Sequence, residues 1–352
     1  MKNWFRHYGI LAFLAVIVIL VSIKTYKYFS KQQVTIGFYH WKKELSLVDE
    51  EEKAILEDKN TPVYLRCFDV DWDEERAFII PRSSLKISKS LPENTPVTPV
   101  VFLSNHIFEA VPDSQMTLIA ETIWERLAQN MSQIEDSGAR ITGIQFDCDW
   151  TLSTKDKYFK FLKEMGDYAT FDLSATIRLH QIKYAEKTGI PPVKRGMLMF
   201  YNMGDLENPN TKNSILDLET AKLYVEYCKN YTLPLDIALP LFQWAVVMRD
   251  GRVVQLLNAA NTSDFADEEL FQKMENGQYK VLESTYAHGY FCYENDIIRL
   301  ENANQSQLEA AATMLSDYLP KERRTLCFYH LDNLILQEHP YSELKKIKEN
   351  ME

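Results

Sequence analysis

The sequence predicts a (β/α)8 barrel, because short apolar runs alternate with amphipathic helical segments along most of its 352 residues. Strands that are buried on both faces of a parallel sheet are continuously apolar, and a helix between two of them allows parallel pairing. Eight such runs are present, the number that closes a barrel of about 250 residues or more. A hairpin region inserted between strands 7 and 8, and one N-terminal membrane helix, complete the expected architecture.

The individual elements follow from the local patterns, taken in chain order. Short apolar runs between polar turns predict strands, and these runs are Val34–Trp41, Val63–Val70, Val97–Ser104, Ile141–Trp150, Asp172–Leu179, Lys194–Met203, Leu235–Trp244 and Thr325–Asp332. Helical periodicity predicts helices over residues 114–134, 155–165, 214–231 and 306–319. Asp113 is expected to cap the first of these helices at its N-terminus.

Two stretches depart from this alternation. Residues 73–92 have no helical pattern, and AFIIPRSSLKI within them indicates extended chain. The long connection after the seventh run contains VVMRDGRVVQLL, which predicts a hairpin around Asp250-Gly251. Further along, YFCYENDIIRL predicts a second extended pair. We expect both to belong to the insertion before the eighth strand.

An uncharged apolar segment, GILAFLAVIVILVSI, occupies residues 9–23. A bilayer-spanning helix needs about 20 residues, and aromatic residues on both sides of this segment can lengthen it at the membrane interfaces. No clear signal-peptide cleavage site follows, although a cleaved signal remains an alternative. We therefore expect a membrane anchor or signal segment over residues 1–29. Residues 30–352 would form a barrel on the periplasmic or extracellular side.

Charge and cysteine content narrow the possible partners. The net charge is −11 and there is no long basic run, which argues against a nucleic-acid partner. Five cysteines are present without a CxxC spacing, so zinc binding by cysteine is not expected. We expect these cysteines to be small buried hydrophobic residues.

Two aspartates end the fourth run, ITGIQFDCDW. Residues two apart on a strand share a face, so Asp147 and Asp149 are expected to face the barrel axis, whereas Phe146 and Cys148 face the helices. Functional side chains of such barrels lie at the C-terminal ends of the strands. Two close, partly desolvated carboxylates have pKa values pushed apart, which suits general acid–base catalysis. A purely structural pair at the top of the barrel is the alternative.

Aromatic and polar residues gather at the other expected strand ends, where four of the six tryptophans lie. Flat rings beside carboxylates and amides suit a sugar, although rings that only plug the barrel are the alternative. The candidate catalytic residues are Asp147, Asp149 and Tyr201. The candidate substrate-binding residues are Tyr39, His40, Trp41, Asp69, Asp71, Trp72, His106, Glu109, Trp150, Asn202, Gln243, Trp244 and His330.

A metal site is a second interpretation of the same strand ends. His40, His106 and His330 end or follow three different runs, with aspartates close by in the sequence. Imidazole and carboxylate groups together bind zinc. There is no HxH or HExxH spacing, so we expect no metal and no cofactor, and a metal-dependent hydrolase stays an alternative.

Three segments carry a resemblance to a known family: the run ending Asp147-Cys148-Asp149, the later MLMFYNMG, and ALPLFQW in the seventh run. Together they resemble the chitinase-like barrels of glycoside hydrolase family 18. They are more similar still to a bacterial family of envelope proteins in the same barrel group. The resemblance covers roughly residues 34–335 and implies a barrel with a sugar-shaped cleft.

The resemblance also bears on the roles of single residues. The family's fourth strand ends in D-x-D-x-E with the glutamate as general acid, and Thr151 stands at that glutamate. Asn202 stands where the family has aspartate after tyrosine, and FYHLD in the eighth run lacks the family's tryptophan. We therefore expect Asp149, nearer the rim, to be the acid and Asp147 its partner, with Tyr201 holding the substrate. The opposing carboxylate would be one of Asp69, Asp71, Glu109 and Glu283.

These observations predict a membrane-anchored envelope protein whose barrel binds a glycan and hydrolyses it. The expected partners are a glycan or oligosaccharide and, through residues 9–23, a membrane. A non-catalytic carbohydrate-binding barrel is the first alternative, favoured by Thr151 and Asn202.

Overall fold

The computed structural model describes residues 33–58 and 60–352. The expected membrane segment over residues 9–23 lies outside this part of the chain. Within it, no helix combines the length and the apolar character that crossing a membrane requires.

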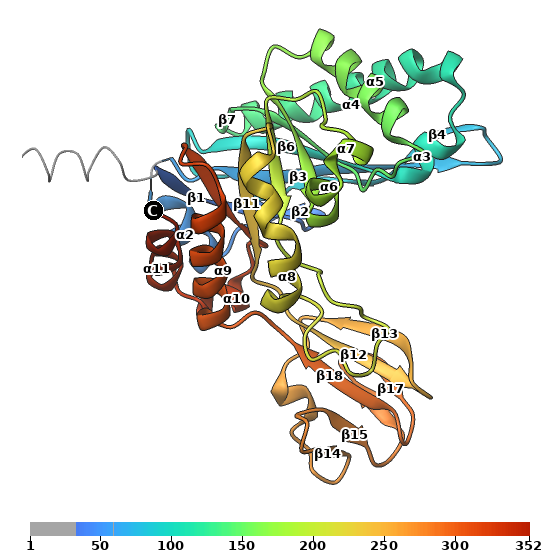
Figure 1. The fold of residues 1–352 in the computed structure, drawn as a ribbon, viewed down its shortest axis with the longest axis vertical. Helices are drawn as coiled ribbons and strands as arrows, with labels where there is room; N and C mark the ends of the chain where they lie inside the picture. Colours follow the sequence, from blue (N-terminus) through green and yellow to red (C-terminus); the bar gives the residue numbers. More distant parts are fainter. Residues whose placement is uncertain (1–32, 59) are drawn as a thin grey trace, which may run out of the picture.

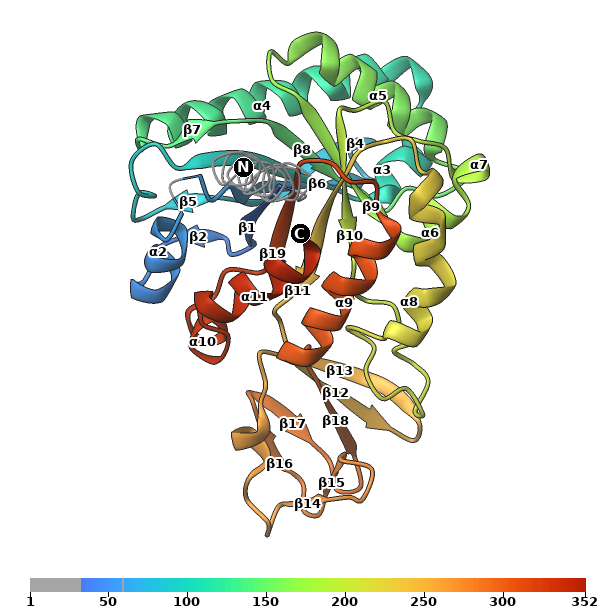
Figure 2. The same ribbon diagram turned by 60° about the vertical axis from the view of Figure 1, so that its left-hand side comes forward.

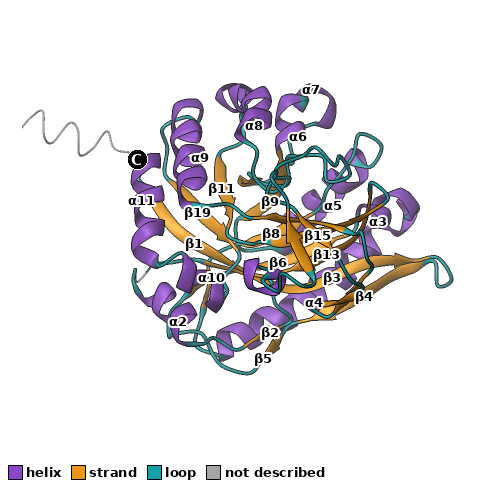
Figure 3. Cartoon of the chain, turned by 90° about the horizontal axis from the view of Figure 1, so that it is seen from below, coloured by secondary structure: helices purple, strands orange, loops and turns teal. Residues whose placement is uncertain are grey.

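Eight parallel strands close into a barrel ringed by helices, as the sequence predicts (Figures 1 and 3). The sheet runs β3-β1-β19-β11-β10-β9-β8-β6, and a further parallel pairing of β6 with β3 closes it. The barrel strands are β1 (Val34–His40), β3 (Val63–Asp73), β6 (Pro96–Leu103), β8 (Ile144–Asp147), β9 (Leu173–Arg178), β10 (Arg195–Met199), β11 (Leu235–Pro240) and β19 (Arg324–Tyr329).

The helices form the outer layer because each has one apolar face. In α4 the buried residues Met116, Ile119, Ala120, Ile123 and Leu127 recur at helical spacing. The helices are α2 (Asp49–Leu56), α3 (Asn105–Ala110), α4 (Met116–Asp136), α5 (Lys155–Tyr168), α6 (Leu179–Lys183), α7 (Ala185–Thr188), α8 (Leu218–Val225), α9 (Gln305–Tyr318), α10 (Asn333–Glu338) and α11 (Tyr341–Met351). The four helices expected from the sequence are all present, although the third ends earlier and continues as a 3-10 turn over Glu226–Asn230.

One expected helix cap is wrong. Asp113 begins a 3-10 turn (Asp113–Gln115) that follows Pro112, and α4 starts only after it. Gln115 therefore holds the cap position of α4, and its side chain makes no capping hydrogen bond.

The stretch after β3 is extended, as expected. β4 (Phe78–Ser84) returns antiparallel along β3 and lengthens it into a two-stranded ribbon beyond the barrel. β5 (Lys86–Ile87) pairs with β2 (Glu44–Leu45), and β7 (Arg140–Ile141) pairs with the start of β6.

The insertion between β11 and β19 is larger than the expected hairpins, and it projects from one end of the barrel (Figures 1 and 2). Its five-stranded sheet contains β12 (Trp244–Arg249), β13 (Arg252–Asn258), β14 (Phe271–Lys273), β15 (Tyr279–Val281) and β18 (Ile297–Glu301). The predicted turn at Asp250-Gly251 joins β12 to β13, with φ of 51° and 73°, the left-handed values that a tight hairpin turn requires.

The second predicted pair in the insertion is wrong. β17 (Tyr290–Cys292) pairs with β16 (Thr285–Ala287), whereas β18 pairs with β12 and β15. The extended character was predictable from the residues, but the partners were not, because they lie far away in the sequence.

Three hydrophobic clusters hold the described chain together. The largest lies between the barrel and its helices, and the insertion has its own cluster around Phe265, Phe271 and Tyr279. The third fills the barrel interior and contains Tyr39, Tyr64, Val100, Met197, Met199, Tyr201, Ala238 and Cys327. All five cysteines are buried and free, as expected.

Candidate functional site

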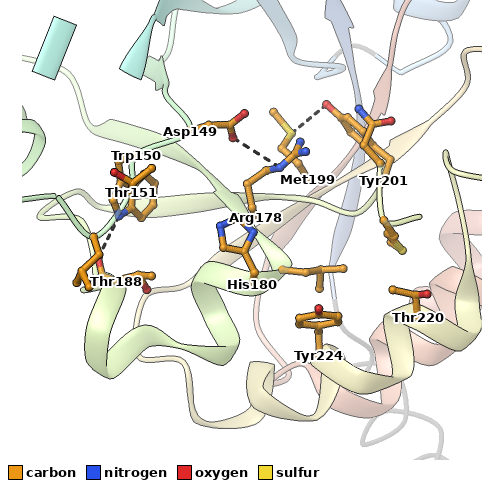
Figure 4. Close-up of a pocket in the computed structure, with 14 residues that line it drawn as sticks. Asp149, Trp150, Thr151, Arg178, His180, Thr188, Met199, Tyr201, Thr220 and Tyr224 are labelled. Atoms are coloured by element: carbon orange, nitrogen blue, oxygen red, sulfur yellow. Dashed lines mark hydrogen bonds and ion pairs between the residues drawn. The ribbon is translucent and has the colours of Figure 1, made fainter. Parts of the chain in front are cut away.

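The C-terminal ends of the barrel strands line a cavity of about 580 Å3, called the mouth cavity below. A second cavity of about 490 Å3 adjoins it, because Tyr201 and Asn202 line both (Figure 4). The predicted residues in the mouth cavity are Trp41, Asp69, Asp147, Tyr201, Asn202, Gln243, Trp244 and His330. Asp149 and Trp150 line the second cavity.

Tyr329, the last residue of β19, lies at the centre of the aromatic cluster in the mouth cavity. Its ring centroid is 5.6 Å from Trp41, 5.4 Å from Tyr201 and 5.8 Å from Phe242. Tyr329 and Phe242 were not among the residues predicted from the sequence. The strand-end rule that selected Trp41 and Tyr201 would have selected Tyr329 as well.

Asp147 is the last residue of β8 and points into the mouth cavity. The preceding Phe146 faces outward and packs on Phe161 of α5, so the predicted alternation of faces holds here. The hydroxyl of Thr176 donates a hydrogen bond to the Asp147 carboxylate at 2.7 Å. Burial raises the pKa of Asp147 to about 6, and the charge of Asp149 adds to this effect. Such a carboxyl group exchanges protons near neutral pH.

Asp149 lies in a different environment. Strand β8 ends at Asp147, so Asp149 sits on the following loop, and 66% of its side chain is exposed. Its carboxylate is 3.6 Å from Nε of Arg178, the last residue of β9 (Figure 4). The two aspartates therefore line adjoining cavities and do not share one.

A β-bulge in β3 brings Arg66 and Asp69 into the mouth cavity together. The register of β3 against β6 shifts between Arg66 and Phe68, so residues three apart face the same side. The Arg66 guanidinium forms a two-pronged ion pair with Asp69, with Nε–Oδ1 at 2.7 Å, and lies 5.2 Å above the ring centroid of Trp41. Arg66 was not predictable from the sequence pattern, because strict alternation places Arg66 and Asp69 on opposite faces of the strand.

Four predicted residues of the β3–β4 ribbon and α3 lie outside both cavities. Asp71 pairs with Arg82 of β4 at 3.3 Å, and Trp72 is packed in the main hydrophobic core. His106 contacts Glu74 at 3.0 Å, and Glu109 accepts a hydrogen bond from Asn105. β3 and β4 extend beyond the barrel, which carries Asp71 and Trp72 away from the mouth, whereas His106 and Glu109 lie on α3. Glu283, also weighed as a carboxylate, is exposed on the insertion.

Three further predicted residues are buried and not open to the mouth cavity. Tyr39 lies inside the barrel, where its hydroxyl donates to Gln145. Burial lowers the pKa of His40 to about 4. Trp150 is 1% exposed and stacks on Tyr158, with its indole nitrogen donating to the Thr188 carbonyl at 3.0 Å.

The three histidines do not form a metal centre with neighbouring carboxylates. His330 lines the mouth cavity, whereas His40 is buried and His106 lies on α3 beside the β3–β4 ribbon. Among the described residues, no group of three or more histidine, cysteine, aspartate or glutamate side chains is placed to hold a metal ion. The metal-dependent alternative therefore has no support from the geometry.

No protein-family model matches this sequence, and no curated protein matches it either. Among solved structures, the fold is similar to a chitinase from Chromobacterium violaceum, with a TM-score of 0.53 and 10% identity over 90% of this chain and 99% of that chain. It is also similar to the spore cortex-lytic enzyme SleL of Bacillus cereus, with a TM-score of 0.52 and 13% identity over 92% of this chain and 75% of that one. The chain therefore shares its closed barrel with these two proteins, which confirms the sequence resemblance at the level of the fold.

Proposed function

We propose that this chain binds a glycan in the mouth cavity and hydrolyses it there. One observation carries the proposal: the same cavity presents a cluster of aromatic rings and a carboxyl group, Asp147, with a pKa of about 6. The chitinase-like fold supports it, since such barrels carry their functional groups at this end.

The binding part of the proposal rests on the aromatic cluster. Trp41, Tyr329, Phe242 and Trp244 are partly exposed in a cavity of about 580 Å3, a size typical of sites for small ligands. The apolar C–H faces of a sugar pack on such rings. Asn202 at the rim and the Arg66–Asp69 pair supply polar groups for its hydroxyls.

The chemical part assigns the proton-donating role to Asp147. A general acid works best when its pKa lies near the working pH, and burial gives Asp147 that property. Asp69, held by Arg66 in the same cavity, is the second carboxylate, which stabilises positive charge on the sugar or assists water. Asp149 is exposed in the adjoining cavity, so the surroundings favour Asp147 over Asp149 as the acid.

The test combines binding and turnover on the purified full-length chain with a panel of glycans. We expect Trp41→Ala to weaken binding, because the ring forms one wall of the cavity. The control Trp124→Ala on α4, where the ring stacks on Tyr168 of α5 and lines neither cavity, should leave binding unchanged. Unchanged affinity in the Trp41 variant for every glycan bound would contradict the proposal.

A non-catalytic glycan-binding barrel is the second candidate. Thr151, at the family's acid position, is exposed and belongs to a hydrogen-bonded turn with Ser153 and Thr154. It has no carboxyl group to donate a proton. Glycan binding that requires Trp41, without turnover in any variant, would favour this candidate.

We further propose that residues 9–23 anchor the chain in a membrane and that the barrel lies on the periplasmic or extracellular side. The uncharged apolar segment supports this proposal. Removal of residues 1–29 should release the barrel from washed membranes. Protease added outside intact cells or spheroplasts should cleave the barrel of the full-length chain, and complete protection would contradict the proposal.

A further inference from the structure

Two basic side chains line the second cavity, the guanidinium of Arg178 and the imidazole of His180. Burial, together with the charge of Arg178, lowers the pKa of His180, so Arg178 supplies the positive charge of this cavity. Arg178 ends β9, and 26% of its side chain is exposed. Figure 4 shows its guanidinium group within the cavity, between Asp149 and Tyr201. Leu179, Thr188, Thr220 and Tyr224 line the same space.

Arg178 is poorly paired for a guanidinium with so little exposure. Its guanidinium forms one ion pair, between Nε and Asp149 at 3.6 Å, and its charge also lowers the pKa of Asp147. Among the described residues, its two terminal nitrogens have no hydrogen-bond or ion-pair partner. By contrast, Arg66, Arg195 and Arg249 each form a two-pronged pair with an aspartate. The outer edge of the Arg178 guanidinium is therefore free to bind an anion.

The shape of this free edge indicates which anion fits. A guanidinium presents two parallel N–H donors that match the two oxygens of a carboxylate. The exposed side chain of Asp149 contacts the Nε side of the guanidinium. A ligand carboxylate bound at the two terminal nitrogens therefore does not displace Asp149. The hydroxyls of Thr188 and Thr220 donate their protons to neighbouring protein oxygens, so their oxygens are left to accept hydrogen bonds from a sugar. The amide of Asn202 can donate to a sugar and accept from it.

We propose that the second cavity binds a sugar residue that carries a carboxylate, with Arg178 as its counter-ion. This inference rests on the proposed function and narrows it to acidic glycans. Tyr201 and Asn202 line both cavities, so a sugar in the second cavity is a chain neighbour of the sugar in the mouth cavity. In the bound glycan, the sugar that carries the carboxylate is therefore linked to the sugar that packs on Tyr329 in the mouth cavity.

The test uses matched pairs of oligosaccharides that differ in one charge. Each acidic glycan, such as a tetrasaccharide of alternating N-acetylglucosamine and N-acetylmuramic acid, is compared with its methyl ester and with the neutral N-acetylglucosamine tetramer. Affinity is measured on the full-length chain, in low and high salt. We expect the acid to bind at least about tenfold more tightly than its ester, because hydrogen bonds to charged groups are strong, and high salt to reduce the difference.

Three variants assign that preference to Arg178. Arg178→Gln should abolish the preference for the acid over the ester, and Arg178→Lys, which keeps the charge without the two-pronged geometry, should retain part of it. Arg82→Gln removes the same charge from β4, outside both cavities, and should leave the preference unchanged.

The outcomes separate this inference from the function on which it rests. Glycan binding with equal affinity for acid and ester overturns the inference and leaves the proposed function standing. A preference for the acid that persists in Arg178→Gln also overturns it. If no glycan of either kind binds, both the inference and the proposed function fail.

Discussion

At the scale of single residues, the two aspartates of the fourth barrel strand differ because the strand ends between them. Asp147 keeps the inward orientation of a strand residue and is desolvated by its neighbours, which raises its pKa to about 6. Asp149 leaves the strand and is exposed beside Arg178. Two carboxyl groups of the same type thus acquire different chemistry from their surroundings.

Substitution of Asp147 tests its proposed role in proton transfer. Asp147→Asn should reduce kcat by about 100-fold or more, since general acid–base groups contribute on that scale, while glycan affinity is retained. The pH profile of the wild type should decline above about pH 6, as the acid loses its proton. The matched variant Asp149→Asn should lose much less activity, and the reverse ranking of the two variants would contradict the assignment.

The raised pKa of Asp147 predicts that the free energy of unfolding depends on pH. The pKa of Asp147 is about 6 in the folded chain against an ordinary value of 3.8, so folding disfavours its ionised form. Above pH 6 this costs about 3 kcal/mol, and the cost disappears as the pH falls from 6 to 4. Asp147→Asn should therefore raise the free energy of unfolding at pH 8 and leave it unchanged at pH 4. Denaturant titrations at both pH values measure this, and equal effects at both would contradict it.

At the scale of elements, strand β18 connects the insertion to the barrel. Arg299 and Glu301 are two apart on this strand, are nearly fully buried and form an ion pair. The Arg299 guanidinium donates to the carbonyl of Leu206 in the loop after β10, at 3.1 Å. Glu301 accepts hydrogen bonds from Ser214 in the same loop and, at 2.8 Å, from the indole nitrogen of Trp244. The insertion therefore fixes the orientation of a ring in the mouth cavity.

Removal of the Glu301 charge tests this connection. Glu301→Gln leaves the buried Arg299 without a charged partner, so we expect a loss of about 3 kcal/mol in the free energy of unfolding. Glycan affinity should also fall, because the Trp244 indole loses a charged acceptor. Denaturant unfolding and binding measurements check both effects. The control Glu283→Gln changes the same charge at an exposed position of the insertion and should alter neither.

At the scale of the whole molecule, the described chain has separate hydrophobic cores for the barrel and the insertion. Phe265 is 2% exposed and packs on Phe271 and Tyr279 within the insertion core. Elements with their own core unfold as separate cooperative units when one of them is weakened. The insertion is thus a subdomain that the barrel carries above its mouth.

Substitution within each core tests this independence. Phe265→Ala should destabilise the insertion by about 3–5 kcal/mol, and amide hydrogen exchange should show lost protection within residues 245–300 alone. Phe328→Ala, in the core between barrel and helices, should lower protection throughout the barrel. Loss of protection across the whole chain in the Phe265 variant would show that the two cores unfold together.

The local pattern predicted the eight barrel strands, because strands buried on both faces must be continuously apolar. It also predicted that Asp147, Tyr201 and Trp41 would lie at one end of the barrel, since parallel strands place all their C-terminal ends on one side. Both conclusions depend on residues close together in the sequence and on the symmetry of the barrel.

Only the tertiary structure decided which side chains face one another at that end. Three features depend on contacts between distant segments: the bulge that turns Arg66 toward Asp69, the length of the β3–β4 ribbon that carries Asp71 away from the mouth, and the pairing of β18 with β12. The pKa of Asp147 and the unpaired edge of Arg178 follow from the same packing, because desolvation and charge pairing are properties of the folded surroundings.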